Sequence, residues 1–243
     1  MIDTHCHILP NVDDGSDSLQ TSMLMAAMAA DDGVTGIIAT PHVIWDRDYN
    51  PEQLSYINKA ADSFRKSLKE SGLPIVCYLG AEVLCAESVP SLLEEGIFPK
   101  IEDTDYALVE FYFDEPAEKI GRCIEEIRSV GIKPILAHPE RYYEVQKQKA
   151  FLNDLVELGC YLQVNKGSFF GQFGKKAQKT AEWIAKNRLA ALLATDAHGV
   201  GSRTTRVAAA IESLSQKYGA EYIRLITKEN PALLLKNRDM HVR

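Results

Sequence analysis

The feature that most constrains this chain is a regular alternation of short apolar runs with longer amphipathic segments. The apolar runs, which we expect to be β-strands, begin at Met1 and recur at residues 34–40, 74–81, 106–109, 132–137, 160–164 and 189–195. They are almost wholly apolar, as is typical of strands covered on both faces. Strands that alternate with helices predict a parallel sheet of right-handed βαβ units. Seven strands, with residues 222–226 undecided between an eighth strand and a helix, favour a (β/α) barrel over an open doubly wound sheet.

The segments between the strands show apolar residues at helical spacing. We expect helices from Ser18 to Asp32, from Pro51 to Gly72, and over residues 90–95, 116–130, 146–158, 175–186, 204–217 and 230–236. No linker-like break in composition interrupts the series, so we expect one domain over residues 1–243. No Gly-x-Gly-x-x-Gly pattern follows a strand, which argues against a dinucleotide-binding fold.

Histidine and acidic residues stand at the carboxyl ends of most of these strands. They are His5, His7, His42, Glu82, Glu110, His138, Asp196 and His198. In a (β/α) barrel these strand ends meet on one face, where active sites lie. One such residue could be a hydrogen-bonded structural group. Eight on one rim, including five of the chain's six histidines, indicate a metal site.

Asp14, on the acidic loop after the first strand, raises the number of candidate ligands to nine. A single catalytic zinc needs three protein ligands, so nine suit two or three ions, with a carboxylate such as Glu82 as a bridge. Histidine and carboxylate without cysteine suit Mn²⁺, iron or Zn²⁺, and the residues alone do not choose among them. Clustered metals favour hydrolysis of phosphate esters by a metal-activated water.

Two arginines point to the same substrate chemistry. Arg141 follows His138 by three residues and Arg203 follows His198 by five, so both should lie on the rim. Guanidinium groups bind phosphate oxygens in a fork, although solvated loop arginines are the simpler alternative. Arg206 competes with Arg203, but we expect it inside the following helix.

The cysteines favour a structural role. A thiol phosphatase needs Cys-x5-Arg, whereas Val12 stands six positions after Cys6. In a strand, Cys6 points away from both neighbouring histidines and into packing. The five cysteines are scattered, as is typical of reduced thiols in the cytoplasm.

Composition excludes other classes of function. The net charge is −7 and no basic run is present, which argues against a nucleic-acid partner. No apolar run approaches the ~20 residues of a membrane span, and no targeting segment is recognisable, so we expect a cytoplasmic protein without membrane insertion.

Five segments together resemble the polymerase and histidinol phosphatase (PHP) family of metal-dependent phosphoesterases. They are Asp3-Thr-His-Cys-His7, Thr40-Pro-His42, Gly80-Ala-Glu82, His138-Pro-Glu-Arg141 and Thr195-Asp-Ala-His198. The length, the Val12-Asp-Asp-Gly15 loop and the His-Pro-Glu-Arg segment are most similar to one branch, the bacterial manganese-dependent protein-tyrosine phosphatases of capsule and exopolysaccharide operons.

The resemblance implies a distorted seven-stranded TIM-like barrel with a trinuclear centre, Mn²⁺ being preferred over iron or Zn²⁺. The implied ligands are the nine side chains named above, and Arg141 and Arg203 match the phosphate-binding arginines. The implied partner is the phosphotyrosine-rich tail of a bacterial tyrosine kinase of polysaccharide export. Residues 166–173 could line the phosphotyrosine cleft, with packing as the alternative for some of their aromatic rings.

We therefore predict a metal-dependent protein-tyrosine phosphatase, a phosphoric monoester hydrolase. One alternative is a small-molecule phosphatase, such as one for histidinol phosphate. The other is a non-catalytic, metal-dependent phosphopeptide-binding protein. The oligomeric state is left open.

Overall fold

The computed structural model describes residues 1–45, 51–85 and 99–242, and its strands form two parallel sheets. The smaller sheet has the order β1 (Ile2–Cys6), β2 (Gly36–Ala39), β4 (Val76–Leu79). The larger has the order β3 (His42–Trp45), β5 (Glu82–Cys85), β6 (Tyr106–Glu110), β7 (Lys133–Ala137), β8 (Tyr161–Asn165), β9 (Ala190–Ala194).

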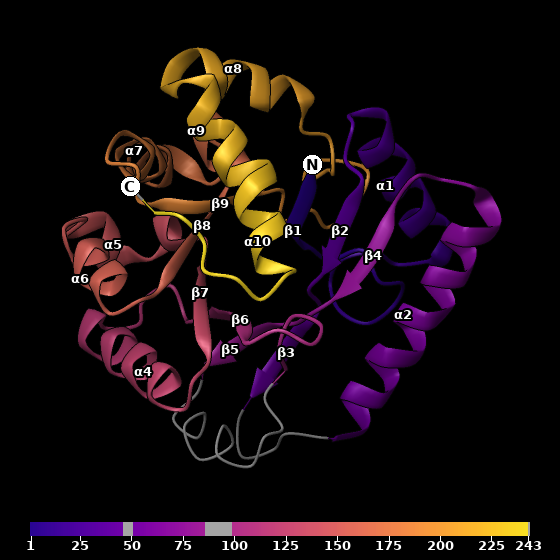
Figure 1. Cartoon of the computed structure of the whole chain (residues 1–243), viewed down its shortest axis with the longest axis horizontal. Coiled ribbons are helices and arrows are strands. Elements are labelled where there is room, and N and C mark those ends of the chain that lie inside the picture. Colours follow the sequence, from indigo (N-terminus) through magenta and orange to yellow (C-terminus); the bar gives the residue numbers. More distant parts are fainter. Residues whose placement is uncertain (46–50, 86–98, 243) are drawn as a thin grey trace.

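The two sheets join into one distorted barrel (Figure 1). Only Thr40 and Pro41 separate β2 from β3, and only two residues separate β4 from β5, so two chain segments continue from one sheet into the other. On the opposite side, a parallel bridge between Cys6 and Ala197 brings β1 beside the end of β9. The described strands thus occupy seven positions around the barrel, which confirms the expected seven-stranded architecture.

Helices surround the strands (Figure 1). The longer ones are α1 (Leu19–Asp31), α2 (Pro51–Ser71), α4 (Ala117–Ser129), α7 (Gly174–Lys186) and α8 (Ala208–Tyr218). The shorter ones are α5 (Tyr143–Lys147), α6 (Phe151–Glu157), α9 (Ala220–Arg224) and α10 (Asn230–Leu234), with a π-helical turn at Leu225–Glu229 and 3₁₀ turns at Pro139–Arg141 and Lys166–Phe170. None of these described helices combines the length and apolar character needed to cross a membrane.

Two helix expectations need correction, one undecided segment is resolved, and one expected helix lies outside the described residues. The expected helix 146–158 is two helices, because Gln148 leaves the helical region at φ −128° and ψ 78°. The helix expected from residue 204 begins at Ala208, where the Asp32 carboxylate accepts hydrogen bonds from the backbone N–H groups of Val207 and Ala208 at 2.6 and 2.9 Å. Residues 222–226, left undecided, are helical. The expected helix 90–95 falls on residues that the structure does not describe.

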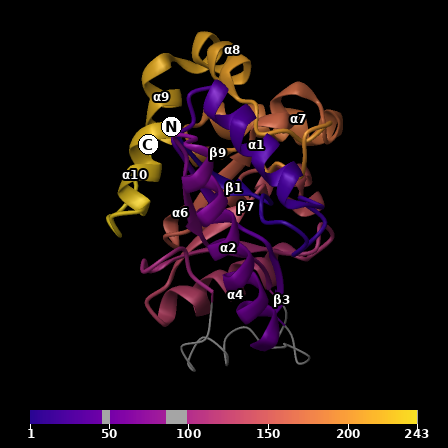
Figure 2. The same cartoon turned by 90° about the vertical axis from the view of Figure 1, so that its right-hand side faces the viewer.

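The core explains which end of the barrel is open to ligands. Two neighbouring residues of β2 belong to different clusters of buried apolar side chains. Ile37 belongs to the cluster that includes the surrounding helices, and Ile38 belongs to a second cluster with Leu234 of α10 and Met240 of the carboxyl-terminal tail. The Tyr106 hydroxyl, at the start of β6, donates to the backbone oxygen of Arg238 at 2.8 Å. The tail therefore covers the amino-terminal ends of the strands, and Figure 2 shows α10 and both termini together on one side. The carboxyl ends face the other way.

Candidate metal centre

The first strand delivers two buried histidines to one point. His5 and His7 are two residues apart, so their side chains leave the same face, and their Nε2 atoms lie 3.1 Å apart. Both rings are fully buried. Each Nε2 lies 3.5 Å from Asp196 Oδ1, which follows β9. These two histidines and Asp196 therefore form a buried part of the site.

The Glu82 carboxylate is the centre of the cluster. Its Oε2 lies 3.0 Å from His5 Nε2, 3.1 Å from His7 Nε2 and 3.3 Å from His42 Nδ1. Its Oε1 lies 2.8 Å from His138 Nε2. His42 and Glu82 open neighbouring strands and pair in register, so the barrel itself sets this contact. The strand ends predicted from sequence therefore meet at this carboxylate.

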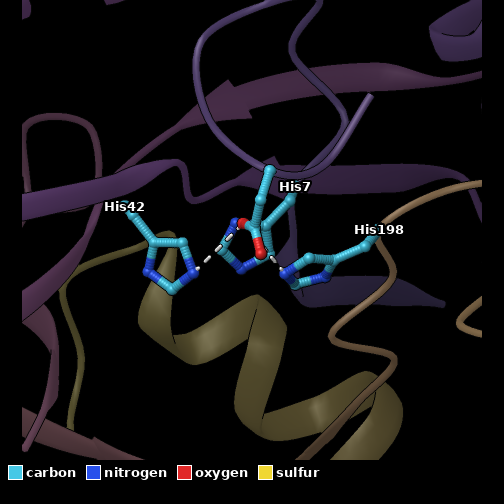
Figure 3. Close-up of side chains that lie close together, drawn as sticks. His7, His42 and His198 are labelled. Carbon is cyan, nitrogen blue, oxygen red and sulfur yellow. Dashed lines mark ion pairs between the residues drawn. The ribbon is translucent and has the colours of Figure 1, made fainter. Parts of the chain in front are cut away.

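Two outer groups complete the set. Glu110 Oε1 lies 3.0 Å from His42 Nδ1. On the solvent side, Asp14 Oδ1 lies 3.6 Å from His42 Nε2 and 3.5 Å from His198 Nε2. Figure 3 shows His7, His42 and His198 converging from three different segments of the chain. The structure thus brings all nine candidate ligands into one connected cluster.

The donor atoms form three overlapping groups, each with its atoms within 4.8 Å of one another. The groups are His5, His7, Glu82 and Asp196; His7, Asp14, His42 and His198; and His42, Glu82 and Glu110. Glu82 Oε2 and Asp196 Oδ1 are buried and make no hydrogen bond of regular geometry, although charged nitrogens of the imidazoles and of Arg203 lie close to them. A buried polar atom without a hydrogen bond costs about 1–3 kcal/mol, and a charged carboxylate oxygen costs more. A cluster of nitrogen and oxygen donors with orphaned carboxylate oxygens fits two or three divalent cations.

The sequence interpretation missed the residues that orient these histidines. His7 Nδ1 lies 2.8 Å from Asp13 Oδ2, and His5 Nδ1 lies 2.7 Å from Gln163 Oε1. Each contact engages Nδ1, so Nε2 is the nitrogen that faces the Glu82 carboxylate. The available signal for Gln163 was a lone polar residue inside an apolar strand. Asp13 gave no separate signal, because it stands beside Asp14 in the same acidic loop.

Negative charge controls the protonation of the cluster. Burial would lower the pKa of His7, but hydrogen bonds to Asp13 and Glu82 overcome that effect and raise the pKa to about 10. Burial also opposes protonation of His5, and the charges of Glu82 and Asp196 again raise its pKa. His198 differs, because burial and the nearby charge of His7 lower its pKa to about 4. Without cations, His7 therefore carries a proton at neutral pH, and the carboxylates also favour protonation of His5.

The backbone is strained at two of the nine positions. His138 has φ 35° and Asp196 has φ 50°, both in the left-handed region that non-glycine residues rarely adopt. Such strain costs on the order of 1–3 kcal/mol and persists where the surroundings impose it. At Asp196, two backbone hydrogen bonds to the first strand hold this conformation. Asp196 N donates to His5 O, and His7 N donates to Ala197 O, each at 2.9 Å.

The arginines stand over the same cluster. Arg203 contacts Asp196 Oδ1 through Nη2 at 2.5 Å, and Arg141 reaches Asp196 Oδ2 through Nη1 at 3.4 Å. The Arg141 guanidinium carbon lies 4.4 Å from the ring centroids of both Phe113 and Phe173. Cation–π contacts of this kind are worth about 0.5–2 kcal/mol each. The two rings form a clamp that holds the guanidinium plane.

Arg206 does not share this position. It precedes α8 rather than lying inside it, so the expected reason for setting it aside was wrong. Its guanidinium contacts Asp32 at 3.0 Å and Asp31 at 3.6 Å, at the end of α1. Arg203 is therefore the arginine that geometry places at the cluster.

The segment 166–173 divides between packing and the site. Phe169 is buried, whereas Phe170 is 55% exposed. Lys166 Nζ donates to the backbone oxygens of Thr204, at 2.6 Å, and Arg206. Only Phe173 of these four residues contacts an arginine of the rim. Packing is confirmed for Phe169, and the expectation that the segment lines a phosphotyrosine cleft stays a prediction, which the position of Phe173 beside Arg141 supports.

Cys6 is packing, as expected. It is fully buried, and its Sγ lies 3.9 Å from the backbone oxygen of Ala197. Burial raises the pKa of this thiol well above its ordinary value. A thiol that keeps its proton is a poor nucleophile.

Comparisons with known proteins identify the family of this chain. The family of capsular polysaccharide synthesis proteins CpsB/CapC matches residues 1–236. The tyrosine-protein phosphatase YwqE of Bacillus subtilis is 33% identical over 98% of this chain and 92% of its own length. The tyrosine-protein phosphatase CpsB of Streptococcus pneumoniae is 30% identical over 98% of this chain and 99% of its own length.

Solved structures give the same result. Crystal structures of YwqE and CpsB, described as unique metal-dependent tyrosine phosphatases, include a chain that matches with TM-score 0.90 at 33% identity. That match covers 100% of this chain and 97% of the other. A putative histidinol phosphatase from Listeria monocytogenes shares the fold alone, at TM-score 0.51 and 14% identity over 83% of this chain and 97% of its own. The family model and the curated relatives both span nearly the whole sequence, and the chain belongs to the CpsB/CapC family of capsular polysaccharide synthesis proteins.

Proposed function

We propose that this chain is a metal-dependent protein-tyrosine phosphatase. The observation that carries the proposal is a cluster of nine nitrogen- and oxygen-donor side chains that includes Glu82 and Asp196, with two arginines at the Asp196 carboxylate. YwqE and CpsB, which match over nearly all of this chain, bear the name tyrosine-protein phosphatase. The reaction is hydrolysis of a phosphoric monoester.

The nine side chains would hold two or three divalent ions, Mn²⁺ for preference, with iron and Zn²⁺ as alternatives. His5, His7, Glu82 and Asp196 supply the inner donors, and Asp14, His42 and His198 supply the outer ones, while Glu110 and His138 complete the set around Glu82. When bound, such ions lower the pKa of a water and neutralise charge on the phosphoryl oxygens. Asp13 and Gln163 hold the imidazoles in the tautomer that this ligation requires.

The chain's own residues bind and orient the phosphoryl group. Arg141 and Arg203 present N–H donors on the solvent side of Asp196, which suits two equatorial phosphoryl oxygens. The Phe113 and Phe173 rings restrict Arg141 to one plane, so less side-chain entropy is lost when substrate binds. Asp14 is 70% exposed, so the cluster is open enough for a phosphotyrosine carried by a protein.

The proposed substrate is the phosphotyrosine tail of a bacterial tyrosine kinase of polysaccharide biosynthesis. Membership of the CpsB/CapC family supports a role in capsule synthesis. The reaction would return the kinase to its unphosphorylated state. We propose that it takes place in the cytoplasm.

The test is hydrolysis of a phosphotyrosine peptide by purified protein. We expect a chelator to abolish the activity and Mn²⁺ to restore it. The Cys6→Ala variant should keep full activity, with a stability loss of about 1–2 kcal/mol for the missing buried atom. An inactive Cys6→Ala protein with normal metal content and a normal fold would contradict the mechanism.

A further inference from the structure

A lysine-rich cavity lies beside the arginine rim and has no part in the chemistry described above. It has a volume of about 540 Å³ and lies between α5 and α7. The residues that line it are Tyr143, Gln146, Lys147, Lys149, Lys176 and Lys179. Four of the six are lysines and none is acidic, although the whole chain carries 34 acidic and 27 basic residues. We call this cavity the lysine pocket.

The chain places the lysine pocket next to the phosphate-binding arginines. Tyr143 follows Arg141 by two residues, and its backbone N–H donates to Phe113 O at 2.8 Å. On the other wall, Phe173 stacks on Arg141 and directly precedes α7, whose first turn carries Lys176. Both walls of the pocket therefore begin at the residues that clamp Arg141. A peptide bound at the arginines has the pocket within about one or two helical turns, or roughly 5–11 Å, of its phosphotyrosine.

The positive charge in the lysine pocket is only partly compensated. Lys147 Nζ contacts Glu144 Oε1 at 2.7 Å, and Lys149 Nζ donates to Gln146 O at 3.1 Å. Lys176 and Lys179 are exposed, and their ammonium groups have no hydrogen-bond or ion-pair partner among the described residues. The first turn of α7 contains no acidic residue that would offset them. Like charges gathered in this way repel one another, and a bound anion removes that cost.

We propose that the lysine pocket binds a second anionic side chain of the same peptide whose phosphotyrosine occupies the metal centre. The proposal rests on the proposed phosphatase function. Ammonium groups attract phosphate and carboxylate alike, so both are candidate sources of the negative charge. A second phosphotyrosine fits best, because the half-exposed ring of Tyr143 offers an aromatic face beside the lysines. The preferred substrates are then tyrosine-rich segments that carry more than one phosphate.

Three peptides of equal length test the proposal. The first has one phosphotyrosine. The second adds phosphonomethyl-phenylalanine, which keeps the negative charge but resists hydrolysis, and the third carries glutamate at that position. The added residue is placed at spacings of about two to six residues, because an extended chain advances about 3.3 Å per residue. We expect the second peptide to show a kcat/KM about three- to tenfold higher at its best spacing, chiefly through KM, as a few exposed charge pairs provide.

The variant Lys176→Gln/Lys179→Gln should lose this gain. The matched control is Lys66→Gln/Lys186→Gln, two exposed lysines on α2 and at the last turn of α7, and it should keep the gain. The rate on p-nitrophenyl phosphate should be unchanged in both variants, because that substrate does not reach the pocket. Added salt should reduce the gain by screening. A similar gain with the glutamate peptide would identify carboxylate as a ligand, and a gain with the phosphonate alone would identify a phosphoryl group.

Two results would overturn the proposal. One is equal kcat/KM for all three peptides in the wild-type protein, and the other is an undiminished gain in Lys176→Gln/Lys179→Gln. Fluorescence anisotropy of the labelled second peptide keeps the test separate from catalysis. If the protein hydrolyses no phosphotyrosine substrate, the proposed function fails. The assignment of the lysine pocket would still hold if Lys176→Gln/Lys179→Gln loses binding of the second peptide and the control variant does not.

Discussion

Replacing Glu82 with glutamine tests whether this carboxylate joins the metal sites. The change keeps the shape of the side chain and removes its charge. Four imidazole nitrogens lie 2.8–3.3 Å from the Glu82 oxygens. A pair of unit charges about 3 Å apart is worth roughly 5 kcal/mol at an effective dielectric constant of about 20.

Desolvation and relaxation offset part of that energy. If the substitution removes about half of this attraction between Glu82 and a bound cation, the free energy of cation binding weakens by about 2–3 kcal/mol, and the affinity for the cation falls roughly 30- to 150-fold. We therefore expect Glu82→Gln to hold at least one ion fewer at limiting Mn²⁺. Its rate on a phosphotyrosine peptide should fall in parallel, and high Mn²⁺ should restore the rate in part.

The assay is metal analysis after equilibration at fixed free Mn²⁺, together with the hydrolysis rate on the same samples. Glu118→Gln is the control, because this residue pairs with Arg122 on the surface of α4 and is 85% exposed. Wild-type metal content and activity in Glu82→Gln at limiting Mn²⁺ would refute the bridging role.

Four further predictions follow from the same contacts. Phe173→Leu removes one ring from the Arg141 clamp, and we expect kcat/KM on a phosphotyrosine peptide to fall about 5- to 30-fold, because about 1–2 kcal/mol of cation–π and positioning energy is lost. The control Phe170→Leu changes an exposed ring and should leave kcat/KM unchanged. Equal effects of the two substitutions would refute the clamp. Because the pKa of His7 is raised to about 10, cation binding at pH 7 must displace a proton from this imidazole, and the affinity for the cation should rise with pH. Calorimetry in buffers of different ionisation enthalpy should detect the released protons. Zero release would contradict the ligand assignment. The raised pKa of His7 also stabilises the metal-free fold. This stabilisation is complete at a pH below 6.5, the pKa of His7 in the unfolded chain, and is lost as the pH rises through about 10, its pKa in the folded protein. The melting temperature of the metal-free protein should therefore fall between pH 7 and 10. Gly15→Ala should lower both thermal stability, by about 1–3 kcal/mol, and metal affinity, because the added Cβ would clash with the backbone oxygen and Cβ of His7; unchanged melting and metal content would show that the loop adapts freely.

The sequence alone was enough to predict the barrel and the location of its polar rim. Strand period places His5 and His7 on one face, and parallel topology carries the other strand ends to the same rim. Both rules act on local patterns, so they needed no knowledge of packing. The structure brings the nine side chains together, and their role as ligands stays a prediction.

Where the chain departs from its local pattern, contacts between distant segments decide the outcome. Helix α8 begins at Ala208 because the Asp32 carboxylate, from the end of α1, accepts its first N–H groups. The helix expected over residues 146–158 is divided in two, and the apolar spacing did not show the break at Gln148.

The same distinction applies within the site. Asp13 and Asp14 are neighbours of the same type, yet one orients His7 and the other faces His42 and His198. Phe113 and Phe173 are 60 residues apart and meet only across Arg141. The sequence by itself determined which residue types reach the rim, because strand period and connection order fix that. Only the tertiary structure decided which of them face the cluster, which orient a neighbour and which arginine is clamped, because those roles depend on side chains packed from separate segments.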